Sequence, residues 1–197
     1  GVNYMHLIDH GRNHVEETYK RPLFDRLMRS ILSYTLPKPR VFLIFALLSK
    51  LIKPFSFLFP TFIKNSLNFM PNRIPLRKIK NQRIYPSLGK KTIARVALLT
   101  GCVQRVISPE INESTIRLLN RHEVEVVVLP EIDCCGSLNH HLGKKDLAHS
   151  SFKNNIELWY KEYLKNGLDA IISNTSGCGT TLKDYGFIFR SDKDLRK

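Results

Sequence analysis

Four cysteines are the residues of this chain whose type and placement point to chemistry. Cys102 ends one apolar run, Cys134 and Cys135 follow a second run after a short loop, and Cys178 follows a third. Open α/β folds bind ligands at the carboxyl ends of parallel strands. Thiolates are soft ligands that select iron–sulfur clusters, zinc or copper(I). The sequence therefore predicts a metal or cluster site with these four residues as ligands.

The gaps between the cysteines bear on the kind of site. Cys102 and Cys134 are separated by 31 residues, and Cys135 and Cys178 by 42. Each gap is long enough for one helix and one strand, which lead from one strand end to the next. Zinc sites usually contain close pairs such as Cys-x2-Cys, which this sequence lacks, although spacing alone leaves zinc open. A further alternative is that some of the cysteines are ordinary core residues, because free cysteine is often buried.

The elements that would position the cysteines lie after residue 92, where strand and helix patterns alternate. The expected strands cover 96–101, 124–129 and 170–175, and the expected helices cover 109–122, 142–166 and 180–187. Such alternation indicates a parallel, doubly wound sheet. Right-handed crossovers then bring the three cysteine-bearing loops to one edge. We therefore expect an α/β fold: a small parallel Rossmann-like sheet with flanking helices.

Glycines beside the cysteines favour an anionic site. Gly136, Gly177 and Gly179 are expected to let backbone N–H groups approach the sulfurs and stabilise the charge of a cluster. Cys178 would precede the helix 180–187, and a thiolate near a helix N-terminus has a lowered pKa.

The first half of the chain differs in charge and pattern. The net charge is +14, and residues 1–92 contribute +13 of it. We therefore predict a helical connector or docking region at 1–70, a basic linker at 71–91 and the α/β domain at 92–197. A basic half of this kind suits an anionic membrane surface or an acidic partner. Nucleic acid is not expected, because a recognition-helix pattern or interleaved exposed aromatic residues are missing.

An apolar stretch at 41–63 raises the question of a membrane span. Helices are expected at 6–35, interrupted at Pro22, and at 40–52. The two long uncharged pieces of the stretch, 41–49 and 54–63, are nine and ten residues, whereas a span needs about 20. A buried helical pair is therefore the first expectation, with an interfacial helix or a partner-docking surface as the alternative.

The cysteine usage and the N-terminus indicate a reducing compartment. The cysteines are few and confined to the second half, and no signal peptide is visible. A cytoplasmic location is expected. Because the chain starts at Gly1 rather than at Met, an upstream segment is expected to precede it.

The cysteine motifs carry a family resemblance. The chain resembles the cysteine-rich (CCG) domain of heterodisulfide reductase and of flavoprotein dehydrogenases, in particular the iron–sulfur subunits of glycolate oxidase. The likeness spans nearly the whole chain. It rests on five segments: 6–12, 22–27, Leu99-Thr100-Gly101-Cys102-Val103-Gln104, Cys134-Cys135-Gly136, and 174–186 with Gly177-Cys178-Gly179 at its centre.

The resemblance implies a function in electron transport. Cys102, Cys134, Cys135 and Cys178 would bind an iron–sulfur cluster, [4Fe–4S] or a variant. Electrons would come from FAD-containing glycolate dehydrogenase subunits and pass towards quinone, with FAD only in the partner. The chain would not be catalytic alone, and it would lie in the cytoplasm, with peripheral contact at the inner face of the plasma membrane as an option. The alternative is a non-redox module with a zinc or empty site.

Two further expectations follow from the resemblance. An N-terminal ferredoxin domain and a second CCG domain would belong to the whole protein, so that the chain is a fragment containing the connector and the first CCG domain. Thr175 stands where the fullest family pattern has a cysteine, which leaves four thiols and opens a choice between a four-cysteine cluster and an empty site.

Overall fold

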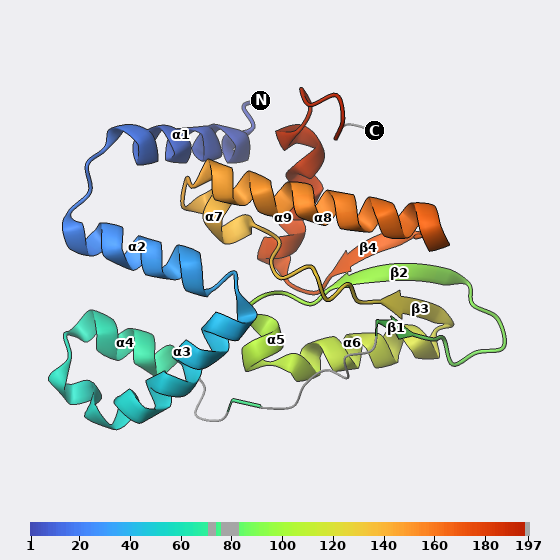
Figure 1. Cartoon of the computed structure of the whole chain (residues 1–197), viewed down its shortest axis with the longest axis horizontal. Coiled ribbons are helices and arrows are strands. Elements are labelled where there is room, and N and C mark those ends of the chain that lie inside the picture. The colour runs from blue at the N-terminus through green and yellow to red at the C-terminus, as the bar shows by residue number, and fades with distance from the viewer. Residues whose placement is uncertain (71–73, 76–82, 196–197) are drawn as a thin grey trace.

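The computed structural model describes residues 1–70, 74–75 and 83–195 (Figure 1). Within the predicted basic linker, residues 71–73 and 76–82 lie outside the described residues.

The centre of the fold is a four-stranded sheet with the order β1-β3-β2-β4. Strands β3, β2 and β4 are parallel, and the short strand β1 pairs antiparallel with β3. The expectation that the three cysteine-bearing strands are parallel neighbours is confirmed, so their carboxyl ends share one edge. The strands are β1 (Ile84–Tyr85), β2 (Ala94–Leu99), β3 (Val124–Val127) and β4 (Ala170–Ser173).

Helices cover both faces of this sheet (Figure 1). On β2, Ala97 and Leu99 face a core shared with α8 and α9, whereas Val96 and Leu98 pack on the α6 side. Because helices cover both faces of the sheet, its central parallel strand needs apolar side chains on both faces. The helices of this half are α5 (Gln104–Ile107), α6 (Pro109–Arg121), α7 (Ser137–His141), α8 (Lys145–Asn166) and α9 (Ser176–Ile188).

The first 70 residues are helical, as predicted, but the expected helix at 6–35 is two helices. Tyr19 is extended and Pro22 precedes the second helix with ψ 149°, because a proline ring and its missing N–H end a helix. The elements are α1 (Tyr4–Thr18), α2 (Leu23–Thr35), α3 (Pro39–Ile52), the 3-10 helix η1 (Lys53–Leu58) and α4 (Thr61–Phe69).

The expectation of a buried helical pair at 41–63 is wrong. In α3 only Pro39, Phe42 and Ala46 are buried, and the last two pack near Val106 of α5. The segment Pro39–Leu58 is apolar and long enough to cross a membrane by length and composition, with 11% of it buried.

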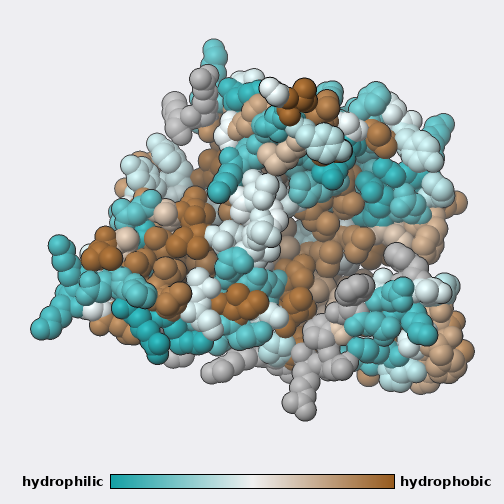
Figure 2. Space-filling view, turned by 180° about the vertical axis from the view of Figure 1, so that it is seen from behind, coloured by the Kyte–Doolittle hydropathy of each residue, from teal (hydrophilic) through white to brown (hydrophobic). Residues whose placement is uncertain are grey.

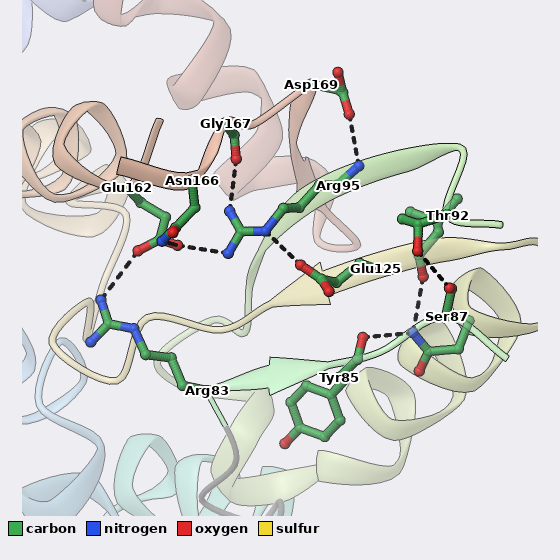
Figure 3. A network of polar contacts seen from close by, with 12 residues as sticks. Arg83, Tyr85, Ser87, Thr92, Arg95, Glu125, Glu162, Asn166, Gly167 and Asp169 are labelled. Carbon is green, nitrogen blue, oxygen red and sulfur yellow. Dashed lines mark hydrogen bonds and ion pairs between the residues drawn. The ribbon is translucent and has the colours of Figure 1, made fainter. Parts of the chain in front are cut away.

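A charged network fastens the sheet to α8 (Figure 3). The Arg95 guanidinium on β2 donates to Glu162 on α8 at 2.7 Å and to Glu125 on β3 at 2.5 Å. Glu162 is only 5% exposed and also pairs with Arg83 at 3.4 Å. The sheet and the helix thus share one set of paired charges, which compensates the burial of the Glu162 carboxylate.

Candidate metal centre

Three loops at the carboxyl edge of the sheet bring the four cysteines together. Cys102 directly follows Gly101, which turns the chain away from β2 with φ +71°. Cys134 and Cys135 lie in the loop after β3. Cys178 differs from expectation: α9 begins at Ser176 rather than at residue 180, so this cysteine is in its first turn.

The four sulfurs form a continuous series of contacts. The Cys134 and Cys102 sulfurs lie 3.4 Å apart, within hydrogen-bond distance, and Cys135 makes side-chain hydrogen bonds with Cys134 and Cys178. All four are free thiols; Cys134 and Cys135 are buried, and Cys102 and Cys178 are half-buried. The structure therefore gathers every cysteine that the sequence singled out into one cluster.

The close packing of the thiols moves their pKa values in opposite directions. The hydrogen bond with Cys134, together with burial, raises the pKa of Cys102 strongly. The hydrogen bond with Cys102 lowers the pKa of Cys134, but the hydrogen bond with Cys135 and burial raise it to about 12. The hydrogen bond with Cys134 lowers the pKa of Cys135, but the hydrogen bond with Cys178 and burial raise it to about 12. The Cys135 hydrogen bond outweighs burial at Cys178 and lowers its pKa. Four neighbouring thiolates need a cation among them, because like charges at this distance disfavour ionisation.

Backbone N–H groups point at the sulfurs. Gly136 N donates to Cys134 Sγ at 3.4 Å, and the backbone groups of Ser137 and Val103 hydrogen-bond to Cys135 and Cys102. These donors favour the thiolate form. The close approach of a backbone N–H to a cysteine sulfur, predicted at Gly136, is present. Gly179 uses its N–H within α9, donating to the Thr175 carbonyl oxygen at 2.9 Å.

Gly136 is also sterically required. Its φ is +80°, and a Cβ there would lie 2.5 Å from the ring of Phe152, which is fully buried. The tight turn after the cysteine pair therefore depends on glycine.

Two buried residues that sequence reasoning missed hold the cysteine pair. Asn155 Nδ2 donates to the Cys134 carbonyl oxygen at 2.9 Å, and Tyr185 Oη donates to the Cys135 carbonyl oxygen at 2.6 Å. Asn155 lies between Phe152 and Trp159 on the apolar face of α8. A polar residue on such a face was the signal that could have found it, because buried amides need partners.

A second polar network supports the loops of Cys102 and Cys178. Thr175 Oγ1 donates to Gln104 Oε1 at 2.6 Å, and Gln104 Nε2 donates to Asn174 at 2.7 Å and to Asn112 at 3.1 Å. The threonine at the first position of the family's Cys-x-x-Cys pattern is thus committed to positioning α5 and α9.

The N-terminal helices contact the short helices that follow the cysteines. Asp9 of α1 lies 3.1 Å from His140 Nε2 on α7, and Arg29 of α2 donates to the Leu142 carbonyl oxygen at 2.6 Å. His140 is buried, with 9% of its side chain exposed, whereas 43% of the His141 side chain is exposed. The Arg12 guanidinium hydrogen-bonds to Asp9 at 2.8 Å and to His141 at 3.1 Å. It therefore supplies the positive charge next to the Asp9 carboxylate.

A polar cavity of about 430 Å³ reaches the site from the side of α2. Cys134 forms part of its wall, together with Ser33 of α2, Asn139 of α7 and Ser151 of α8. Cys134, although buried, therefore borders an open cavity.

The donor set fits a soft metal centre. Four thiols with N–H donors are the ligands of iron–sulfur and zinc sites. The Cys134 and Cys102 sulfurs lie 3.4 Å apart. Two sulfurs bound to one tetrahedral ion by bonds of about 2.3 Å would lie roughly 3.8 Å apart, which is close to this distance. A cluster of several irons needs the sulfurs farther apart than this.

Comparison with known proteins agrees with this geometry. Residues 96–183 match the model of the cysteine-rich domain family, CCG. The matched segment contains all four cysteines.

Along almost its whole length the chain is similar to iron–sulfur subunits of glycolate oxidase. It is 33% identical to the Escherichia coli K12 subunit over 98% of this chain and 44% of that protein. It is 28% identical to a probable subunit from Bacillus subtilis over 98% of this chain and 46% of that protein. It is also similar to one of the subunits of a CoM/CoB fumarate reductase from Methanothermobacter marburgensis, with 32% identity over 50% of this chain and 19% of that protein.

The chain thus spans about half the length of the glycolate oxidase relatives that it matches. No solved structure matches it significantly.

Proposed function

We propose that this chain is an iron–sulfur electron-transfer subunit of a flavin-dependent 2-hydroxy-acid dehydrogenase, with glycolate as the substrate of the assembly. The observation that carries the proposal is the convergence of Cys102, Cys134, Cys135 and Cys178 at one sheet edge inside the CCG domain. These four thiols are the proposed ligands of a [4Fe–4S] cluster or a variant of it.

The proposed partners are FAD-containing glycolate dehydrogenase subunits. The names of the relatives support an oxidoreductase assembly in which glycolate is oxidised elsewhere. This chain would receive electrons and pass them towards quinone, without turning over substrate alone. The proposed location is the cytoplasm, at the inner face of the plasma membrane.

The chain's own residues do three things for such a cofactor. An iron–sulfur cluster supplies one-electron transfer when it is bound. The N–H groups of Gly136, Ser137 and Val103 stabilise negative charge on the sulfurs. Burial of Cys134 and Cys135 keeps water from two ligands, while the half-buried Cys102 and Cys178 face the side where electrons would enter or leave.

The test is metal analysis of protein purified without oxygen, followed by reconstitution with iron and sulfide. We expect about four irons and four acid-labile sulfides per chain, with visible colour, if four thiolates hold one cubane. Cys178→Ser should lose most of this iron. Ser176→Ala, exposed in the same turn of α9, is the matched control and should keep it.

One zinc per chain without sulfide would replace the redox proposal by the alternative, a structural zinc module that docks through its basic half. Failure to bind iron after reconstitution would contradict the assignment of the four cysteines.

A further inference from the structure

The charge of one long segment is entirely positive. Residues 26–109 contain 16 lysines and arginines and no aspartate or glutamate. This segment includes α3, η1 and α4 and ends at the start of α6. A surface with this charge is complementary to anionic headgroups.

The same segment exposes large apolar side chains. At about 100° per residue, the exposed residues of α3 cover the half of the helix opposite Phe42 and Ala46. Figure 2, seen from behind, shows hydrophobic atoms along the outer edge at the lower right, where α3, η1 and α4 lie, with hydrophilic atoms in front of them. The exposed set is Ile44 (57%), Phe45 (48%), Leu47, Leu48, Leu51 (71%) and Ile52 of α3, with Phe55, Phe57 (73%), Leu58 (69%) and Phe59 at and after η1.

The way in which α3 is attached indicates a helix that lies on a bilayer rather than across it. Phe42 and Ala46 pack against Ile74 and against Val106 of α5. Pro54 and the change to 3-10 geometry at Lys53 turn the chain, and η1 contacts α4. A helix fixed along one side to a folded domain buries its opposite side in the interface of one leaflet.

We propose that α3 and η1 form a membrane-docking surface that inserts into the interface of a bilayer rich in anionic lipid. Lys38, Arg40 and Lys50 would keep their charged ends among the headgroups while the aromatic and aliphatic side chains enter the acyl boundary. The inference deepens the proposed function, because quinone is a membrane molecule, and docking through α3 would hold α5 and the neighbouring Cys102 near the bilayer.

Lipid fits this surface better than a protein partner does. A helix that docks on protein shows a narrower apolar stripe, whereas here the apolar half of α3 continues around the turn into η1. Residues 26–109 contain no acidic residue, and the exposed Lys38 and Arg40 lie at the start of α3. Such cations are complementary to anionic headgroups.

The test is sedimentation of the whole chain with vesicles of phosphatidylcholine and phosphatidylglycerol at 3:1, compared with phosphatidylcholine alone. The variant is Phe45→Asp/Leu48→Asp. Its matched control is Leu118→Asp/Leu164→Asp, which makes the same change of charge and hydropathy at exposed positions of α6 and α8. Binding needs no cluster, so this result is separate from that of the metal analysis.

We expect binding to the anionic vesicles, with at least a 100-fold loss in the α3 variant, because each large side chain withdrawn from the bilayer costs roughly tenfold. The affinity of the Leu118→Asp/Leu164→Asp control for the vesicles should stay within about twofold of that of the original chain, once the effect of its two added negative charges is subtracted. A tryptophan placed by Phe57→Trp should be quenched by brominated lipid, whereas the native Trp159 is buried.

Three results would overturn the proposal. Equal losses in both double variants would reduce the effect to net charge. Absence of vesicle binding, with the apolar face covered instead in a stable dimer, would assign the surface to a second copy of the chain. Cleavage within η1 by a protease enclosed inside sealed vesicles would indicate a span.

Discussion

Asn155 on α8 and Cys134 at the sheet edge are joined by a hydrogen bond of 2.9 Å from the side-chain amide to the backbone carbonyl oxygen. Asn155 is 1% exposed, and the same amide donates to Tyr185 Oη at 3.2 Å. Through this pair, the longest helix of the described chain fixes the backbone of two proposed ligands.

Asn155→Ala should therefore destabilise the protein by about 2 kcal/mol, because it leaves a buried carbonyl without its donor. For a chain of this size the melting temperature should fall by roughly 4–8 °C. Differential scanning calorimetry measures this change. The neighbouring Asn154 is exposed, and Asn154→Ala should change the melting temperature little. Equal effects of the two substitutions would exclude a special role for Asn155.

Gly136→Ala should be more damaging than an alanine at another glycine with positive φ. The new methyl group would meet the Phe152 ring, so strain and overpacking together should cost about 3 kcal/mol. Gly101 has φ +71°, and a Cβ there would make only ordinary contacts, the nearest with Gln104 Cβ at 3.4 Å, so Gly101→Ala should cost only about 1 kcal/mol. Urea unfolding of the two variants separates the contact with Phe152 from backbone strain.

Glu162→Gln should make stability less dependent on acid pH. Burial raises the pKa of Glu162, but hydrogen bonds from Arg95 and Asn166 outweigh it and hold the pKa below its usual 4.5. A carboxylate with a lowered pKa stabilises the fold above about pH 4.5, and this stabilisation is lost as the pH falls through the lower, folded-state value.

The difference in unfolding free energy between the original chain and Glu162→Gln should therefore be about 2–3 kcal/mol at pH 7 and shrink below about pH 4.5. Glu157, exposed on the same helix, supplies the control Glu157→Gln. A constant difference from neutral pH down to acid pH would mean that the Arg95 network acts through packing rather than charge.

Asp9→Asn should release α1 from the domain without unfolding it. The Asp9 carboxylate is buried and meets Arg12, His140 and His141, so its loss leaves three nitrogen groups facing one another. We expect hydrogen exchange in α1 to accelerate at least roughly tenfold, while exchange in the strands of the sheet changes little. Glu17→Gln, exposed on the same helix, should have no such effect.

The sheet and its edge could be predicted because local patterns determine them. Runs such as Val96–Leu99 are apolar on both faces, and only a central parallel strand buries both. The convergence of the four thiols then follows from topology. Glycines made the start of α9 look like a loop, since Gly177 and Gly179 flank Cys178. In the structure Thr175 precedes the helix and the first turn accommodates both glycines.

The exposure of α3 and the role of Asn155 could not be predicted in the same way. An apolar helix has the same sequence signature whether protein, lipid or water surrounds it, and only the position of Phe42 against α5 tells which side is covered. Asn155 bonds the backbone of a loop 21 residues away, and such a partner is defined only when the fold is complete.

Supply of the ligands by three separate loops has a consequence for biosynthesis. Strand β2 lies between β3 and β4, and Cys178 follows β4, so the ribosome completes the last ligand loop only after the other three thiols have been made. Cys102 and Cys134, whose sulfurs lie 3.4 Å apart in the complete fold, are the pair that an oxidant would join. Loading of the cofactor is thus a late step of maturation, and cells that make this protein in air must keep the nascent thiols reduced until β4 has docked.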